Sequence, residues 1–305
     1  MINIFINSAG NMPSTLSFGI PSVTGSEMSP ASFKKVMRFL KDNYDDGISI
    51  SGGEPLTHSH IKEILGVIKV TNNLNSIFFN TSGTLLSKLV DEFIEMSQIK
   101  EFVSICLYYK KSELLKDLPV TIDLLRKNNI KVELGVEVLN ISGQSFRDLF
   151  KFAEETSIKV LRWEITIPKR ENLPSDFYLS VKDNLMSLMR LCVEHRITPY
   201  TSCNHIPYCF FNSDELRVLS YISNDNFGGP KCDNYINFHP NNYASGCVAL
   251  NSIENNLNFD SIDFSVLKDI LKIKSEAFME QNLMIECKNC PYRGLLVKRC
   301  GCMGF

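Results

Sequence analysis

The stretch ISISGGEP, residues 48–55, joins a short apolar run to two glycines, a glutamate and a proline. Such a run is typical of a buried strand, and the glycines end it. Glycine lets the polar groups of another molecule approach the backbone closely, and Glu54 adds an acceptor at the same rim. Gly52, Gly53 and Glu54 therefore predict a strand that ends in a ligand-binding turn. A plain turn that needs glycine is the alternative.

The same order of strand and helix repeats six times before about residue 195. We predict strands at 2–6, 48–51, 76–79, 102–108, 131–139 and 159–167, and helices at 30–43, 59–71, 84–97, 112–128, 145–156 and 181–195. Strands that alternate with helices of this length predict an α/β fold with a parallel sheet and right-handed crossovers. Six units are two short of an eightfold barrel, so we expect an open barrel or an open doubly wound sheet. In either fold, ligands bind at the carboxyl ends of the strands.

Composition narrows the functional class. The chain has 305 residues, of which 44% are hydrophobic, and its net charge is −2. This near-neutral balance disfavours nucleic acid as a partner. No apolar run approaches the ~18–20 residues that cross a bilayer, so we expect no membrane association. Asn3, Asn7 and Asn11 interrupt the first apolar stretch, which argues against a secretory signal and predicts a cytoplasmic protein.

The ten cysteines are unevenly distributed. Cys106 and Cys192 lie alone in apolar segments, where free cysteine packs as a small hydrophobe. The other eight follow residue 200, where helical and strand periodicity weaken. We therefore predict a boundary near residue 200, with an α/β domain over 1–200 and a small cysteine-rich, metal-stapled extension over 201–305.

The extension carries a strong metal-binding signal. A C-x2-C pair presents two sulfurs to one metal from a tight turn, and a second close pair completes four thiolates. The two close pairs are Cys287 with Cys290 and Cys300 with Cys302, and Cys232 and Cys247 precede them as further candidates. Four thiolates suit either structural zinc or an iron–sulfur cluster, and zinc is the default for this spacing.

Other polar residues are weaker candidates, each with a structural alternative. They are Cys203 and Cys209 with His205, as ligands or as a packed loop; His58 and His60, which we expect at an exposed helix start; Glu133 with Glu137; and Arg162 with Glu164. The last two pairs have period-two spacing, so each pair shares one side of its strand. They are either polar site residues or structural groups.

The segment GNMPSTLSF, residues 10–18, follows the first strand, and FNTSG, residues 79–83, ends the third. With cysteines at positions 10, 14 and 17, the first segment would read C-x3-C-x2-C. Together with GGEP, these stretches make residues 1–195 resemble the radical S-adenosylmethionine superfamily. The resemblance implies a (β/α)6 partial TIM barrel. It also implies cofactor-binding roles for Gly52, Gly53, Glu54, Pro55, Asn80 and Ser82.

The chain departs from that family at the three cluster ligands. Gly10, Ser14 and Ser17 stand where the family has cysteines. Serine and glycine do not replace thiolates as cluster ligands, because iron–sulfur clusters are held by cysteine almost throughout. Without the cluster, no electron can be delivered to the sulfonium group of S-adenosylmethionine. S-adenosylmethionine binding is therefore possible but weakened, and we expect no radical chemistry.

The C-terminal cysteines resemble the SPASM and twitch extensions of radical S-adenosylmethionine enzymes that modify peptides. This resemblance implies an auxiliary 4Fe–4S cluster at residues 201–305, with zinc as the alternative. It predicts a pseudoenzyme that binds a precursor peptide or a partner maturation enzyme during modification of a ribosomally made peptide. The alternatives are an active radical enzyme seen as a cluster-cysteine variant, and an S-adenosylmethionine-binding enzyme that uses non-radical chemistry.

Overall fold

The computed structural model describes residues 2–7, 26–41, 47–72, 74–108, 117–138, 143–165, 175–201, 208–222, 236–240, 242–246, 257–259 and 262–281. The chain forms two compact units, Met1–Glu133 with Asp233–Ser275, and Leu134–Cys232 with Glu276–Phe305. These units do not coincide with the segments 1–200 and 201–305, because residues 233–275 group with the start of the chain. The assignment of functional domains to those two segments stays a prediction.

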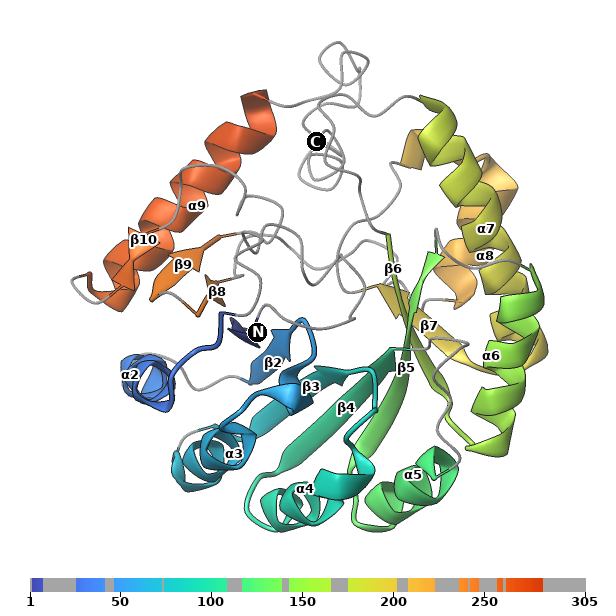
Figure 1. Ribbon diagram of the computed structural model, residues 1–305. Helices are drawn as coiled ribbons and strands as arrows, with labels where there is room; N and C mark the ends of the chain where they lie inside the picture. Colours follow the sequence, from blue (N-terminus) through green and yellow to red (C-terminus); the bar gives the residue numbers. More distant parts are fainter. Residues whose placement is uncertain are drawn as a thin grey trace. The chain divides into compact units, whose positions relative to one another are not determined.

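The first unit contains most of the predicted strands and helices. Its elements are β1 (Ile2–Asn7), α2 (Pro30–Lys41), β2 (Ile48–Gly52), η1 (Pro55–Thr57), α3 (Ile61–Val70), β3 (Ser76–Thr81), η2 (Ser87–Leu89), α4 (Val90–Ser97), β4 (Phe102–Tyr108), α5 (Leu118–Lys127), β8 (Asn237–Phe238), β9 (Tyr243–Ser245) and β10 (Leu257–Asn258). Helix α9 (Phe264–Gln281) also begins here. Figure 1 shows α3, α4 and α5 along the same side of strands β2, β3 and β4.

The strands of this unit follow the order β10-β9-β8-β1-β2-β3-β4. Strands β1 to β4 pair in parallel, as the alternating pattern predicts, and β8 also lies parallel to β1. Strands β8, β9 and β10 pair antiparallel. The carboxyl ends of β1, β2 and β3 therefore lie next to one another.

The two faces of these strands differ in polarity. On the helix-covered face, Phe79 of β3 packs edge-on against Phe93 of α4, with ring centroids 4.9 Å apart. Because side chains alternate along a strand, Asn80 lies on the opposite face. Ser49 is the register partner of Phe78, so the serines of β2 share that opposite face. Both faces are buried, as is usual for parallel sheets, but the face opposite the helices carries more polar side chains.

The second unit continues the same alternation. Strand β5 (Lys131–Glu137) crosses the boundary between the units, and α6 (Gly143–Glu155), β6 (Val160–Glu164), α7 (Ser175–Glu194), β7 (Thr198–Thr201), η5 (Tyr208–Phe210) and α8 (Ser213–Ile222) follow. Strands β5, β6 and β7 pair in parallel. The α/β class with a parallel sheet is thus confirmed. Among the described residues, no helix combines the length and apolar character that crossing a membrane requires.

Candidate functional site

The predicted ligand-binding turn lies between β2 and β3, and Glu54 is its central residue. The Glu54 side chain is 4% exposed. Its Oε1 accepts hydrogen bonds from the backbone N–H of Leu56 at 3.1 Å and from the Thr81 hydroxyl at 2.7 Å. Its Oε2 accepts from the backbone N–H of Ser82 at 2.6 Å. The carboxylate therefore caps η1 and ties the end of β3 to the turn after β2.

Asn7 is a member of this site that the sequence did not indicate. It is fully buried, and its amide Nδ2 donates to the Glu54 carbonyl oxygen at 2.7 Å. The Gly53 N–H donates to the Asn7 carbonyl oxygen at 3.1 Å. A Cβ at Gly52 would lie 2.2 Å from Asn7 Oδ1, so only glycine fits beside this side chain. The first glycine of the motif is thus required by close packing within the fold.

Three of the predicted cofactor-binding residues lie together at the carboxyl end of β2, which forms the rim of the site. Gly52 ends β2, Gly53 follows it, and Pro55 begins η1. Asn7 Oδ1 is buried and accepts no hydrogen bond from the described residues. An acceptor without a donor suits an ammonium group, so the residues present fit the amino end of an amino-acid cofactor. Whether the cofactor binds there stays a prediction.

Asn80 and Ser82 occupy different positions at the end of β3. Ser82 lies at the surface, where its hydroxyl shares a 2.9 Å hydrogen bond with that of Thr84. Asn80 is 2% exposed, and its amide Nδ2 donates to the hydroxyls of Ser49 at 3.0 Å and Ser51 at 2.7 Å. The structure therefore separates a surface residue from a buried one that the sequence had placed in a single group.

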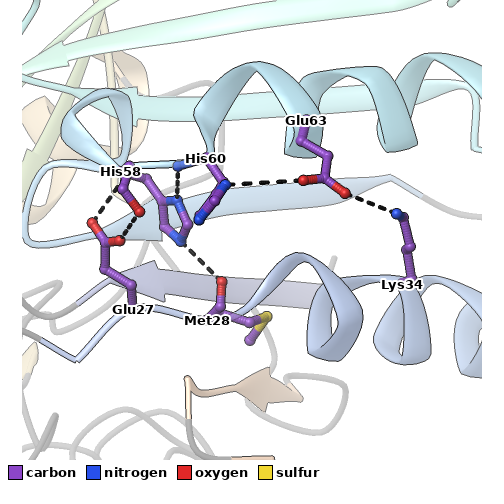
Figure 2. Close-up of polar contacts among 7 residues, drawn as sticks. Glu27, Met28, Lys34, His58, His60 and Glu63 are labelled. Carbon is purple, nitrogen blue, oxygen red and sulfur yellow. Dashed lines mark hydrogen bonds and ion pairs between the residues drawn. The ribbon is translucent and has the colours of Figure 1, made fainter.

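A second polar cluster lies around Glu27 and His58, between the segment that precedes α2 and the segment that precedes α3 (Figure 2). The Glu27 carboxylate accepts from both the backbone N–H and the hydroxyl of Ser59. Burial alone would raise the pKa of Glu27, but the Ser59 bonds and the neighbouring His58 and His60 outweigh it and lower that pKa. The backbone of Glu27 also forms an isolated antiparallel β-bridge with Asn7. This cluster therefore lies next to the turn that contains Glu54.

His58 is buried, which makes the prediction of an exposed helix start wrong for this residue. Its Nδ1 accepts from the His60 N–H at 3.0 Å, so its Nε2 carries the proton and donates to the Met28 carbonyl oxygen at 2.9 Å (Figure 2). The short helix η1 turns His58 inward. His60 is exposed as predicted, and lies 4.0 Å from the Glu63 carboxylate. Hydrogen bonding to Lys34 lowers the pKa of Glu63.

The first 191 residues contain a single cysteine, Cys106. It is fully buried in β4, in a cluster with Phe78 and Tyr108, which confirms its predicted core position. Cys192 in α7 is also fully buried, and burial raises its pKa to about 12. Neither thiol suits a metal, because a ligand thiol must ionise. The residues of this segment therefore do not fit a thiolate-held cluster.

The remaining metal predictions concern residues outside the described part of the chain. These are Gly10, Ser14 and Ser17, the pair Cys203 and His205, and the six ligands Cys232, Cys247, Cys287, Cys290, Cys300 and Cys302. Cys209 is described, and it is exposed in η5. Within the described residues, no group of three or more histidine, cysteine or carboxylate side chains could hold a metal ion.

The acidic residues of β5 and β6 are buried, as polar site residues would be. Glu133 is 2% exposed and pairs with Lys131 at 2.6 Å. Glu137 and Glu164 are direct register partners on the neighbouring strands. Arg162 donates to the Tyr200 hydroxyl from Nε at 3.0 Å and from its terminal nitrogen at 2.6 Å. Strand pairing thus brings Glu137 next to Glu164, and a role for any of these residues in a site stays a prediction.

Comparison with known proteins gives a family match in the first part of the chain. Residues 13–131 match the family model of a 4Fe-4S single cluster domain. The chain is also 25% identical over 136 residues to the GTP 3',8-cyclase of Helicobacter pylori (strain HPAG1). That alignment covers 41% of this chain and 42% of the cyclase, so the chain matches less than half of that relative's length.

Solved structures share the fold over nearly the whole chain. Streptococcus suis SuiB bound to S-adenosylmethionine has a TM-score of 0.67 and 14% identity, covering 98% of this chain and 71% of SuiB. SuiB bound to its precursor peptide SuiA has the same TM-score at 15% identity, covering 98% and 70%. The protein anSMEcpe with bound AdoMet has a TM-score of 0.64 and 15% identity, covering 98% and 87%. Residues 13–131 thus match an iron–sulfur family model, and the chain shares the fold of SuiB and anSMEcpe.

Proposed function

We propose that this chain is a catalytically degenerate member of the radical S-adenosylmethionine superfamily, an accessory or maturation protein that binds peptide during the modification of a ribosomally made peptide. One observation carries the proposal. The segment that matches the 4Fe-4S family model contains only Cys106, and that thiol is fully buried in the core of β4. A cluster needs several ionised thiolates at one place, so this segment lacks the donors for one.

The peptide partner is supported by the proteins that share the fold. SuiB was solved bound to the precursor peptide SuiA, and anSMEcpe was solved with bound AdoMet and an added peptide. At 13–15% identity these likenesses support a shared scaffold, and they bring the peptide to this chain only as a proposal. A scaffold can still bind peptide after cluster chemistry is lost, since binding needs only shape and hydrogen bonds.

The C-terminal cysteines supply the metal part of the proposal. Six thiols between residues 232 and 302 provide enough ligands for one 4Fe–4S cluster, with zinc as the alternative. We assign the cluster a stapling role in the extension, because the proposed pseudoenzyme has no sulfonium-cleaving centre to reduce. Bound metal of this kind stabilises a folded state outright.

A second candidate is an S-adenosylmethionine-binding enzyme with non-radical chemistry. It is favoured by Asn7 Oδ1, a buried acceptor that receives no hydrogen bond from the described residues, beside Gly52, Gly53 and Pro55. The cofactor would supply an electrophilic methyl group. The backbone groups of Gly52, Gly53 and Pro55 would hold the amino end of the cofactor. Glu54 would contribute only by holding the turn in shape.

The test is a count of iron and sulfide after anaerobic reconstitution of the full chain, followed by reduction with S-adenosylmethionine present. We expect about one cluster per chain and no 5′-deoxyadenosine. The double variant Cys287→Ala/Cys290→Ala should lose that cluster, whereas the matched control Cys106→Ala should retain it. Two clusters per chain, or 5′-deoxyadenosine formation, would overturn the degenerate assignment. Zinc without sulfide would overturn the iron–sulfur assignment alone.

A further inference from the structure

Asn80 forms a buried hydrogen-bonding unit with two serines, and this unit plays no part in holding the turn. Each of the two Nδ2 protons of Asn80 goes to one hydroxyl, at 3.0 Å to Ser49 and 2.7 Å to Ser51. All three side chains are at least 97% buried on the face of β2 and β3 that lies opposite α4. The amide therefore holds both hydroxyls in fixed positions while its own oxygen points away from them.

The unit has unused hydrogen-bonding capacity. Asn80 Oδ1 is buried and accepts no hydrogen bond from the described residues. Each serine oxygen accepts from Asn80, so each hydroxyl proton is available for donation, and within the described part of the chain neither hydroxyl donates a hydrogen bond. One acceptor and two donors thus remain at one place. Leaving such groups unpaired in a protein interior is costly, so a complementary group is expected there.

The surroundings are apolar on one side. Cys106 is the register partner of Asn80 on β4, and it belongs to a buried cluster with Phe78 and Tyr108. Phe78 precedes Asn80 by two residues and so lies on the same face. Aromatic and thiol neighbours exclude water, which strengthens any hydrogen bond that a ligand makes with the polar unit.

The chemistry of the unused groups selects among ligands. A carboxylate could accept from both hydroxyls but has no proton for Asn80 Oδ1. An ammonium group could serve Oδ1 but has no lone pair for the hydroxyls. One residue of an extended peptide matches both requirements, since its C=O has two lone pairs, its N–H donates, and the two groups point the same way as in a sheet ladder.

We propose that Asn80, Ser49 and Ser51 form a binding site for the main chain of an extended peptide, with Asn80 Oδ1 accepting one backbone N–H and the serine hydroxyls donating to the C=O of the same residue. This inference rests on the proposed peptide-binding function and names the group that is recognised. It assigns Asn80 to the peptide, whereas the sequence resemblance placed it with the cofactor. Recognition of the main chain would tolerate different side chains, as a maturation scaffold requires.

The test compares two small probes on the full chain. N-acetylglycine N-methylamide carries the required N–H, whereas O-acetylglycolic acid N-methylamide has an ester oxygen in its place. Binding is followed through the side-chain amide signals of Asn80 in nuclear magnetic resonance spectra, which are identified by their loss in Asn80→Asp. We expect saturable shifts with the amide and about tenfold weaker binding of the ester, because the ester leaves Asn80 Oδ1 unpaired.

Serine variants provide the control. Ser51→Ala removes one donor and should weaken binding of the amide probe about fivefold. Ser104→Ala changes the register partner of Phe78 on β4, outside the three-residue unit, and should leave affinity unchanged. Equal affinity for the two probes, equal effects of the two variants, or no shift of the Asn80 signals would overturn the inference. An absence of any shift in the Asn80 signals is expected if Asn80, Ser49 and Ser51 hold only a water molecule.

Failure here is distinguishable from failure of the proposed function. The probes need neither a cluster nor S-adenosylmethionine nor a partner protein. If the metal count gives one cluster without 5′-deoxyadenosine and the probes do not bind, the degenerate assignment stands and the peptide site falls. If 5′-deoxyadenosine forms while the amide probe binds as expected, the degenerate assignment falls and the peptide site stands.

Discussion

Glu54→Gln tests whether the glutamate of the GGEP motif serves the fold or a ligand. The carboxylate accepts three hydrogen bonds, from Leu56 N–H, the Thr81 hydroxyl and Ser82 N–H, while 4% exposed. Glutamine keeps the shape of the side chain but replaces one oxygen with an NH2 group. If the remaining oxygen faces Leu56 and Thr81, the new NH2 opposes the Ser82 N–H, and both donors are then unpaired.

The expected loss of stability follows from these contacts. A hydrogen bond to a charged group contributes about 1.5–3 kcal/mol, and a buried group left unpaired costs about 1–3 kcal/mol. The variant loses at least one such bond and gains an opposed pair of donors, so we expect the free energy of unfolding to fall by about 3 kcal/mol. Urea denaturation followed by circular dichroism measures this difference.

The matched control is Glu63→Gln, which changes the same residue type in the exposed ion pair with Lys34. Exposed pairs contribute little, so this variant should unfold at nearly the same urea concentration as the wild type. Our interpretation of Glu54 is refuted if Glu54→Gln changes the free energy of unfolding by less than about 0.5 kcal/mol, the usual range for surface substitutions. Unchanged stability combined with weaker S-adenosylmethionine binding would instead identify Glu54 as a ligand-binding group.

Two further predictions concern the same region. Gly52→Ala would place a Cβ 2.2 Å from Asn7 Oδ1 and should destabilise the protein by about 1–3 kcal/mol in urea, whereas Gly66→Ala in α3 meets nothing within 4 Å and should stabilise it by about 0.5–1 kcal/mol; equal effects would contradict the packing. The pKa of Glu27 is lowered from its ordinary value of 4.5, so its contribution to stability is present above that pH and is lost as the pH falls through the lowered pKa. Urea midpoints should therefore fall less steeply with acid in Ser59→Ala than in the wild type, and parallel curves would show that Ser59 does not lower this pKa.

The regular strands of the first 165 residues were predictable because their apolar runs record burial directly. The prediction for 102–108 matches β4 at both ends, and that for 48–51 misses β2 by one residue. Helix 84–97 was predicted too long, since α4 begins at Val90 after the short helix η2. Apolar residues occupy both segments, so the pattern does not show where one helical form gives way to another.

The short strands after residue 195 were missed for a different reason. Strand β8 has two residues and exists because Asn237 and Phe238 pair with β1, more than 230 residues earlier. Strand β7 contains Pro199 and has four residues, which is too short for a visible alternation. No local pattern carries this information, because distant partners create these strands.

The candidate site shows the same division between local and distant causes. The sequence marked Gly52, Gly53 and Glu54 because glycine and an acceptor stand out at a strand end. It could not show that Glu54 is bonded to Thr81 and Ser82, since those donors arrive on another strand. It also passed over Asn7, whose burial follows only from the pairing of β1 with β2.

This division bears on how the GGEP motif is interpreted in a chain whose first 191 residues contain a single cysteine. Asn7 packs against Gly52 and binds the Glu54 carbonyl oxygen, while the Glu54 carboxylate holds the end of β3. Each of these contacts lies within the fold and needs no cofactor. Loss of the cluster would therefore leave the motif under the same structural requirement as before. The presence of the GGEP motif is therefore compatible with a degenerate protein. The cysteines available as cluster ligands, and not this motif, decide whether radical chemistry is possible.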